Sequence, residues 1–287
     1  MTTSAVSFTV GGNINVSGQV NIYTGAMHLS SDASTITTTA TGDTLTWAPP
    51  YTVAGAKLTV AGPGTVIFGD AAFHSTPFTL TAETDVTSGS VQFNGAVTGK
   101  IDISGGNAGF FVLESTLASL VATGGTVTFD VPQTVAGDLI LGAGATVSSD
   151  ISGRAMLIAQ GDVTLGATLS VADNTDYLIE KDSSGPVSGT FAGLPDGATF
   201  SVDGTEHRIL YHAGFHSSDT NDVIETIGDV DAPTAALTPP TVHDTDTGTT
   251  FSITFNDATG VSNTAIIGNN NLFQVTGPTG YSTFATF

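Results

Sequence analysis

Four aspartates are the best candidates for metal chemistry in this sequence. Asp229 and Asp231 stand in Gly-Asp-Val-Asp-Ala-Pro, and Asp244 and Asp246 stand in Asp-Thr-Asp-Thr-Gly. Ca²⁺ takes several oxygen ligands, and carboxylates commonly supply them. The second pair is similar to the opening of a calcium loop, but the third acid and the distal Glu of such a loop are absent. The pattern indicates Ca²⁺ as the candidate cofactor, with solvated acidic turns as the alternative.

Two histidines offer a second, weaker arrangement. His212 and His216 are four residues apart, and Asp219 and Asp222 follow them. On a helix, such a pair can bind zinc. Here the pair falls in a predicted turn between strands, and the Glu of an HExxH motif is missing. A solvated loop is therefore the favoured interpretation.

Trp47 and Tyr51 flank Ala-Pro-Pro and are the candidate ligand-binding residues for a glycan. Aromatic rings have an apolar face that can stack on a sugar, and they also pack well at the end of a sheet. Both interpretations remain open from the sequence. The glycan hypothesis requires exposed rings around Trp47, and buried rings would count against it.

No arrangement of residues predicts covalent catalysis. The chain lacks a Gly-x-Ser-x-Gly elbow, and its few basic residues are scattered along the sequence. They are Lys57, Lys100, Arg154, Lys181 and Arg208. The acids Asp102, Asp130, Asp138 and Asp150 form no recognisable motif. A polysaccharide lyase or hydrolase, the enzymatic alternative, would need clustered acids beside at least one Lys or Arg.

The composition excludes some partners. The 26 acidic residues outnumber the 5 basic ones and give a net charge of −21. Binding to nucleic acid needs basic residues that neutralise phosphates, so we expect no nucleic-acid partner. Cysteine is absent, which rules out disulfides and thiolate metal sites. No stretch reaches the ~18 apolar residues of a membrane span, so we expect no membrane insertion by this segment.

Short β-rich runs separated by Gly, Asn, Asp or Ser recur along the chain, and similar sequence patterns recur about every 20–25 residues. One coil of such a repeat cannot bury its own inner face, so stacking must supply the core. The pattern predicts an all-β fold, with a right-handed parallel β-helix (solenoid) over residues 1–226. A β-sandwich is the rival, since Asn94-Gly95 and Asp203-Gly204 suit hairpin turns. Residues 112–121 fit a helix or a strand–turn–strand equally well.

Residues 177–225 carry a resemblance to a known family. Tyr177-Leu-Ile, Gly193-Leu-Pro-Asp-Gly-Ala, Arg208-Ile-Leu-Tyr and Asn221-Asp-Val follow one another in this order. The order is similar to the final unit of bacterial autotransporter-type β-helix passengers. The loop at 212–219 is longer than the Gly-rich turn typical of that unit. The resemblance implies an exported scaffold whose β-helix is closed by this unit.

The residue pattern of the repeats changes after residue 226. We predict a linker over residues 227–232 and an incomplete Ig-like domain over residues 233–287. Asp231-Ala-Pro resembles the typical start of a bacterial Ig-like module, and Phe251-Ser-Ile-Thr-Phe-Asn-Asp resembles its second strand. Such a sandwich needs about 100 residues and about seven strands. We therefore expect the parent chain to continue into further modules, with a marginally ordered tail as the alternative.

Together these patterns predict a structural or adhesive segment of a large exported bacterial surface protein. It would act outside the cell or at its surface, as a spacer or as a scaffold that binds glycans or surface proteins. No export signal is visible at Met1-Thr-Thr-Ser, so export would depend on another signal. The alternatives are a polysaccharide-active enzyme and a carbohydrate-binding module, because one fold hosts many functions.

Overall fold

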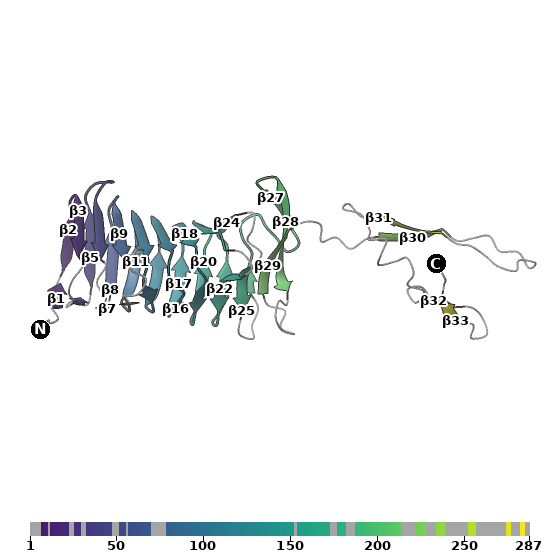
Figure 1. Cartoon of the computed structure of the whole chain (residues 1–287), viewed down its shortest axis with the longest axis horizontal. Coiled ribbons are helices and arrows are strands. Elements are labelled where there is room, and N and C mark those ends of the chain that lie inside the picture. The colour runs from purple at the N-terminus through teal and green to yellow at the C-terminus, as the bar shows by residue number, and fades with distance from the viewer. Residues whose placement is uncertain are drawn as a thin grey trace, which may run out of the picture. The chain divides into compact units, whose positions relative to one another are not determined.

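The chain forms two compact units in a computed structural model, Met1–Gly228 and Asp229–Phe287, which are described separately (Figure 1). The division falls within the predicted linker. The structure describes residues 7–10, 12–22, 26–29, 33–47, 52–55, 57–69, 79–151, 154–172, 177–181, 187–213, 222–227, 234–238, 252–256, 274–276 and 282–284. These residues form strands, turns and bends without a helix, so none of them belongs to a helix that could span a membrane.

The first unit is a β-solenoid in which successive strands join different sheets in turn (Figure 1). Sheet A contains β1 (Ser7–Val10), β4 (Ala26–Leu29), β7 (Thr52–Ala54), β10 (Thr79–Leu80) and β13 (Ala96–Val97). Sheet B contains β2 (Asn13–Val16), β5 (Ser34–Thr38), β8 (Lys57–Ala61), β11 (Glu83–Val86), β14 (Lys100–Ile103), β17 (Ser119–Ala122), β20 (Leu139–Leu141), β23 (Val163–Leu165) and β26 (Val187–Gly189).

Two further sheets complete the solenoid. Sheet C contains β3 (Gln19–Ile22), β6 (Thr44–Trp47), β9 (Thr65–Phe68), β12 (Ser90–Phe93), β15 (Asn107–Phe110), β18 (Gly125–Phe129), β21 (Ala145–Ser149) and β24 (Thr168–Val171). Sheet D takes the place of sheet A in the later coils. It contains β16 (Ser115–Leu117), β19 (Gln133–Val135), β22 (Ala155–Ala159), β25 (Tyr177–Lys181), β27 (Thr199–Val202), β28 (Thr205–Ala213) and β29 (Asp222–Ile227). The predicted all-β solenoid is confirmed.

Strands in sheets B and C pair in parallel with the strands of the coils before and after. The coils differ in length: Thr84 pairs with Leu58 of the preceding coil and with Ile101 of the following coil, which is much nearer along the chain. Alternate residues are buried, because successive side chains of a strand point to opposite faces. The corners between strands absorb the variation in coil length, so the inward positions stay in register.

The core is a set of columns that run from coil to coil. The inward position near the end of five successive sheet C strands, β6 to β18, carries an aromatic residue. These residues follow one another in register and are Trp47, Phe68, Phe93, Phe110 and Phe129. All five side chains are buried. The ring centroids of Phe93 and Phe110 lie 4.9 Å apart, and those of Phe110 and Phe129 lie 5.3 Å apart. These distances suit stacked rings and match the spacing between strands.

Close approach between coils explains one of the recurrent glycines. Gly125 begins β18 with φ +72°, and a Cβ added to it would lie 2.0 Å from the carbonyl oxygen of Gly106 in the preceding coil. An L side chain would therefore meet both backbone strain and a collision with the backbone. Glycine at this corner allows two coils to stack.

One of the two predicted hairpin turns is found in the structure, and the other is not. Asp203 and Gly204, with φ of 49° and 90°, connect β27 to β28 in an antiparallel pair, as a two-residue hairpin turn requires. Asn94 and Gly95 follow β12, which pairs with β9 and β15 in parallel. They therefore form a corner of the solenoid, and the prediction of a hairpin there is wrong. Residues 112–121 contribute strands β16 and β17, not a helix.

Antiparallel strands close the C-terminal end of sheet D. Strand β29 pairs with β25 in antiparallel orientation, β28 pairs with β29, and β27 pairs with β28. The edge of β25 is thereby covered by antiparallel chain, while β26 and β24 are the end strands of sheets B and C. An exposed sheet edge is a template for association, and this arrangement covers the edge of sheet D at β25.

The second unit contains two antiparallel strand pairs in its described part. Strand β30 (Thr234–Thr238) pairs with β31 (Ser252–Asn256), and β32 (Gln274–Thr276) pairs with β33 (Ser282–Phe284). All five side chains of β30 are exposed, and Leu237 is 59% exposed. The described residues include no sandwich of two packed sheets, so the Ig-like domain stays a prediction.

Candidate functional site

A ladder of five charged side chains lies on the outer face of sheet B. Lys57 begins β8, Glu83 and Asp85 are on β11, and Lys100 and Asp102 are on β14. These positions alternate with buried ones, so they point away from the core. Glu83 pairs with Lys57, and Asp85 pairs with Asp102, in the register of the sheet. We call these five residues the charged ladder.

Across the strands, Lys57, Glu83 and Lys100 alternate in sign. Asp85 and Asp102 stand opposite each other, and each of them forms an ion pair with a lysine. The Nζ of Lys57 lies 2.6 Å from Oδ2 of Asp85, and the Nζ of Lys100 lies 2.8 Å from Oδ2 of Asp102. Glu83 lies between the two lysines, with its Oε1 3.5 Å from Lys57 and 3.8 Å from Lys100. Opposite charges on neighbouring strands stabilise a sheet modestly. The ladder therefore joins three coils through their outer surface.

The ion pairs keep both lysines protonated. The hydrogen bond to Asp85 is the main cause that raises the pKa of Lys57, and the hydrogen bond to Asp102 does the same for Lys100. A lysine that acts as a general base near neutral pH needs the opposite shift. The ladder can bind or orient an ionic group, but its lysines are poorly suited to accept a proton.

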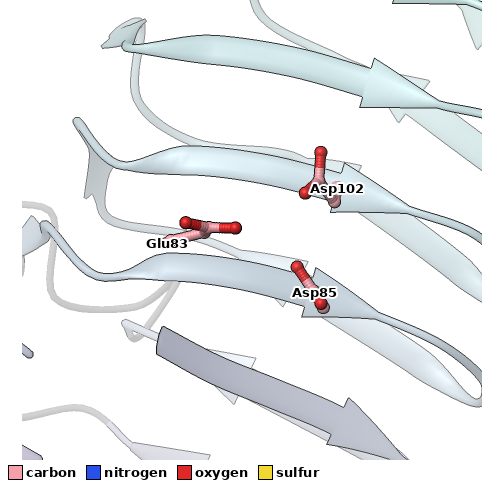
Figure 2. A group of neighbouring side chains, drawn as sticks. All are labelled: Glu83, Asp85 and Asp102. Atoms are coloured by element: carbon pink, nitrogen blue, oxygen red, sulfur yellow. The ribbon is translucent and has the colours of Figure 1, made fainter. Parts of the chain in front are cut away.

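The carboxylates of the ladder are close enough to meet at one cation. Figure 2 shows Glu83, Asp85 and Asp102 on neighbouring strands, and one oxygen from each lies within 4.8 Å of the others. The Oδ1 atoms of Asp85 and Asp102 are shielded from solvent and have no hydrogen-bond partner among the described residues. These oxygens could hold a hard cation such as Ca²⁺. The lysine ammonium groups compete for the same carboxylates.

The structure corrects the glycan hypothesis at Trp47. Its side chain is 2% exposed and belongs to the aromatic column under sheet C. A buried ring offers no platform to a sugar, so the expected exposed aromatic surface at this position is wrong. The alternative interpretation, that the ring packs in the sheet, fits its place. Tyr51, the second predicted residue, lies outside the described residues.

Most of the predicted metal ligands lie outside the residues that the structure describes. Asp229, Asp231, Asp244 and Asp246 lie outside the residues that the structure describes, as do His216 and Asp219. His212 is near the end of β28, and Asp222 begins β29. Asp222 is buried, and its Oδ1 accepts a hydrogen bond of 2.8 Å from the backbone N–H of Lys181. This contact gives Asp222 a structural role in joining β29 to β25.

The segment that resembles a terminal passenger unit is organised around Tyr211. The Tyr211 hydroxyl accepts a hydrogen bond from the N–H of Phe191 and donates one to the carbonyl of Leu194, each 2.8 Å long. The N–H of Tyr211 donates to Oδ1 of Asp196. Burial raises the pKa of Tyr211 to about 12, so its hydroxyl stays protonated. The Gly-Leu-Pro-Asp-Gly turn is thus held against β28.

Sequence reasoning missed the charged ladder because its members come from three coils. Lys57 and Lys100 look scattered in the sequence, and Asp102 belongs to no motif. A signal was present in Glu83-Thr-Asp85 and Lys100-Ile-Asp102, where charges alternate with inward residues. Without the register, nothing indicates that these pairs are neighbours. Comparison with known protein families, curated proteins and solved structures finds no match to this chain.

Proposed function

We propose that this chain is a structural segment of a large exported bacterial surface protein. It would act as a spacer or ligand-displaying scaffold outside the cell, without catalysis of its own. The single observation that carries the proposal is the continuous core of the solenoid, in which each coil packs on the next and antiparallel strands cover the edge of β25 in sheet D. Stacked repeats of this kind make extended, stiff bodies with long lateral surfaces.

The finer parts of the proposal depend on sequence patterns. In this proposal the solenoid is right-handed, its terminal unit is of the autotransporter-passenger type, and residues 233–287 form part of an Ig-like module. Asp229, Asp231, Asp244 and Asp246 would bind Ca²⁺ and stiffen the segment between modules. Surface proteins or glycans would be its partners.

Cell-surface labelling tests the proposed function. An antibody raised against the 287-residue chain is applied to intact and to permeabilised cells that make the parent protein. We expect labelling of intact cells, and loss of that labelling after brief protease treatment. Labelling that requires permeabilisation would contradict the proposal. A cytoplasmic protein labelled in parallel verifies that the cells are intact.

The charged ladder favours one second candidate, a polysaccharide-active enzyme. Three acids lie beside two lysines, which is the cluster that such an enzyme would need. The raised pKa values of the lysines argue against proton abstraction by either of them. Incubation with polygalacturonate and measurement of unsaturated or reducing products decides the matter. Product formation that disappears in Asp85→Asn and Asp102→Asn variants would replace the scaffold proposal with an enzyme.

A further inference from the structure

The outer face of sheet C carries two columns of uncharged side chains in register. The first column is Gln19, Thr44, Thr65, Ser90, Asn107, Thr126, Thr146 and Thr168. The second column is Asn21, Thr46, Ile67, Gln92, Gly109, Thr128, Ser148 and Ser170. Neither column contains a charged residue, although the chain has a net charge of −21. The face is therefore a neutral surface on an acidic protein.

Apart from Ile67 and Gly109, the members of the two columns carry hydroxyl or amide groups, which form a regular array of hydrogen-bonding groups. Adjacent strands in a sheet are about 4.8 Å apart, and outward residues of one strand are about 7 Å apart. Hydroxyl and amide groups both donate and accept hydrogen bonds, so the array can meet hydroxyl groups of either orientation. A repeating, polyhydroxylated ligand suits an array that repeats in this way.

An aromatic ring lies on this same face. Gly109 occupies an outward position of β15, and a Cβ added there would lie 2.2 Å from Cζ of Phe111. The ring of Phe111 therefore covers the space that a side chain at residue 109 would fill, and it stays half-buried. In the register of the sheet, Gly109 stands between Gln92 and Thr128. The glycine thus makes room for an aromatic ring within a polar array.

We propose that the outer face of sheet C binds a neutral polysaccharide, with Phe111 as the stacking residue and Gln92 and Thr128 as hydrogen-bonding residues. Sugars combine an apolar C–H face with a rim of hydroxyls, which matches a ring flanked by an amide and a hydroxyl. The strongly acidic chain repels anionic polymers, and a neutral polymer avoids that cost. The proposal deepens the proposed function by naming the ligand class of the scaffold.

Co-sedimentation of the full chain with insoluble cellulose, chitin and mannan tests the proposal. We expect retention on at least one of them, and a roughly tenfold weaker association for Phe111→Ala, because an aromatic anchor contributes on the order of one factor of ten. Ile140→Ala is the matched control, since it removes an outward apolar side chain from sheet B. It should bind like the native chain.

A second pair of variants keeps the test independent of folding. Gln92→Glu changes one group of the array into a carboxylate at constant size, and it should also weaken retention. Thr164→Asp places a charge on the outer face of sheet B and should leave retention unchanged. Thermal unfolding measured by circular dichroism verifies that each variant is folded. If Phe111→Ala unfolds, Gln92→Glu decides.

Several results would overturn the proposal. These are no retention on any of the three polymers, retention that survives both Phe111→Ala and Gln92→Glu, or binding to polygalacturonate that is lost in Lys57→Met/Lys100→Met. Self-association by light scattering that Phe111→Ala abolishes would mean that a second copy covers this face. Cell-surface labelling is independent of all these results, so a failure of sugar binding and a failure of the proposed function are distinguishable.

Discussion

Sheet B and sheet C share one solenoid and the same alternation of inward and outward side chains, but they differ on both faces. Inward positions of sheet B are mostly aliphatic, as at Leu58, Ile101 and Leu120, whereas sheet C contains the aromatic column. The polar exceptions in sheet B are Ser34, Thr38 and Thr84. Outward, sheet B carries the charged ladder and sheet C carries neutral hydroxyls and amides. Packing constrains the inward residues, while the outward residues are free to serve binding.

The largest expected effect concerns the two inner faces. Phe110→Ala removes a ring from the middle of the aromatic column, and we expect it to lower the free energy of unfolding by about 3–5 kcal/mol. Leu120→Ala in sheet B should cost about 2–5 kcal/mol. Urea unfolding followed by circular dichroism measures both. A loss at Phe110 well below that at Leu120 would show that the aromatic column is not the stronger half of the core.

The corner between the two sheets should give the next effect. Asp43 lies between β5 of sheet B and β6 of sheet C, and it accepts hydrogen bonds from the N–H groups of Gly18, Thr39 and Ala40. The hydrogen bond from the Thr39 hydroxyl is the main cause that lowers the pKa of Asp43 to about 2, and the backbone N–H groups contribute further. A depressed folded pKa stabilises the fold above the unfolded value of 3.8, and that contribution is lost as pH falls toward 2.

Asp43→Asn tests this link between the sheets. We expect the variant to melt at a lower temperature than the native chain at neutral pH, and the difference to shrink as pH falls from about 4 to about 2. Thermal unfolding across that range gives the measurement. Asp138→Asn serves as the control, because Asp138 is an exposed residue between two strands. An undiminished difference at acid pH would mean that the charge of Asp43 is not what holds the corner.

The outer face of sheet B should respond to pH and salt, unlike that of sheet C. The pKa values of Lys57 and Lys100 are raised, so their contribution is fully present below 10.5 and is lost as pH rises through the higher folded values. Lys57→Met should cost about 0.2–1 kcal/mol, because the pair with Asp85 is partly exposed. High salt should reduce that cost.

Thr126→Val on sheet C is the companion variant for the salt experiment. It replaces one neutral side chain of the outer array by another of similar shape, so its effect on the melting temperature should be the same at low and high salt. A salt-dependent effect at Thr126, or none at Lys57, would remove the distinction between a charged and a neutral face. Melting temperatures in low and high salt, at neutral pH, decide between these outcomes.

The sequence was sufficient for the all-β class and the stacked coils, because short strands and glycine corners recur along it. It was insufficient for the register, since successive coils differ in length, as the pairing of Thr84 with both Leu58 and the much nearer Ile101 shows. Without the register, the neighbours of Lys57 and Lys100 could not be predicted. Trp47 shows the same limit, because an aromatic residue beside two prolines fits an exposed platform as well as a core position.

Calcium gives the smallest expected effect and the sharpest test of what the charged ladder is. Each aspartate of the ladder already has a lysine Nζ 2.6 or 2.8 Å from its Oδ2. We therefore expect that Ca²⁺ bound at the ladder does not raise the melting temperature of the native chain. In Lys57→Met/Lys100→Met, three carboxylates within 4.8 Å lose their counter-ions. That variant should gain stability from millimolar Ca²⁺, since a ligand that binds only the folded state stabilises it.

The four aspartates predicted to bind Ca²⁺ in the second unit must be replaced before this comparison is made. Asp229→Asn, Asp231→Asn, Asp244→Asn and Asp246→Asn are therefore combined in both backgrounds, so that any remaining calcium effect comes from the solenoid. Melting temperatures with Ca²⁺ and with chelator give the readout. A calcium-dependent rise in the background with intact lysines would mean that the ladder is a metal site in which the lysines yield to the ion. A rise only after their removal would identify the lysines as the fixed counter-ions of sheet B.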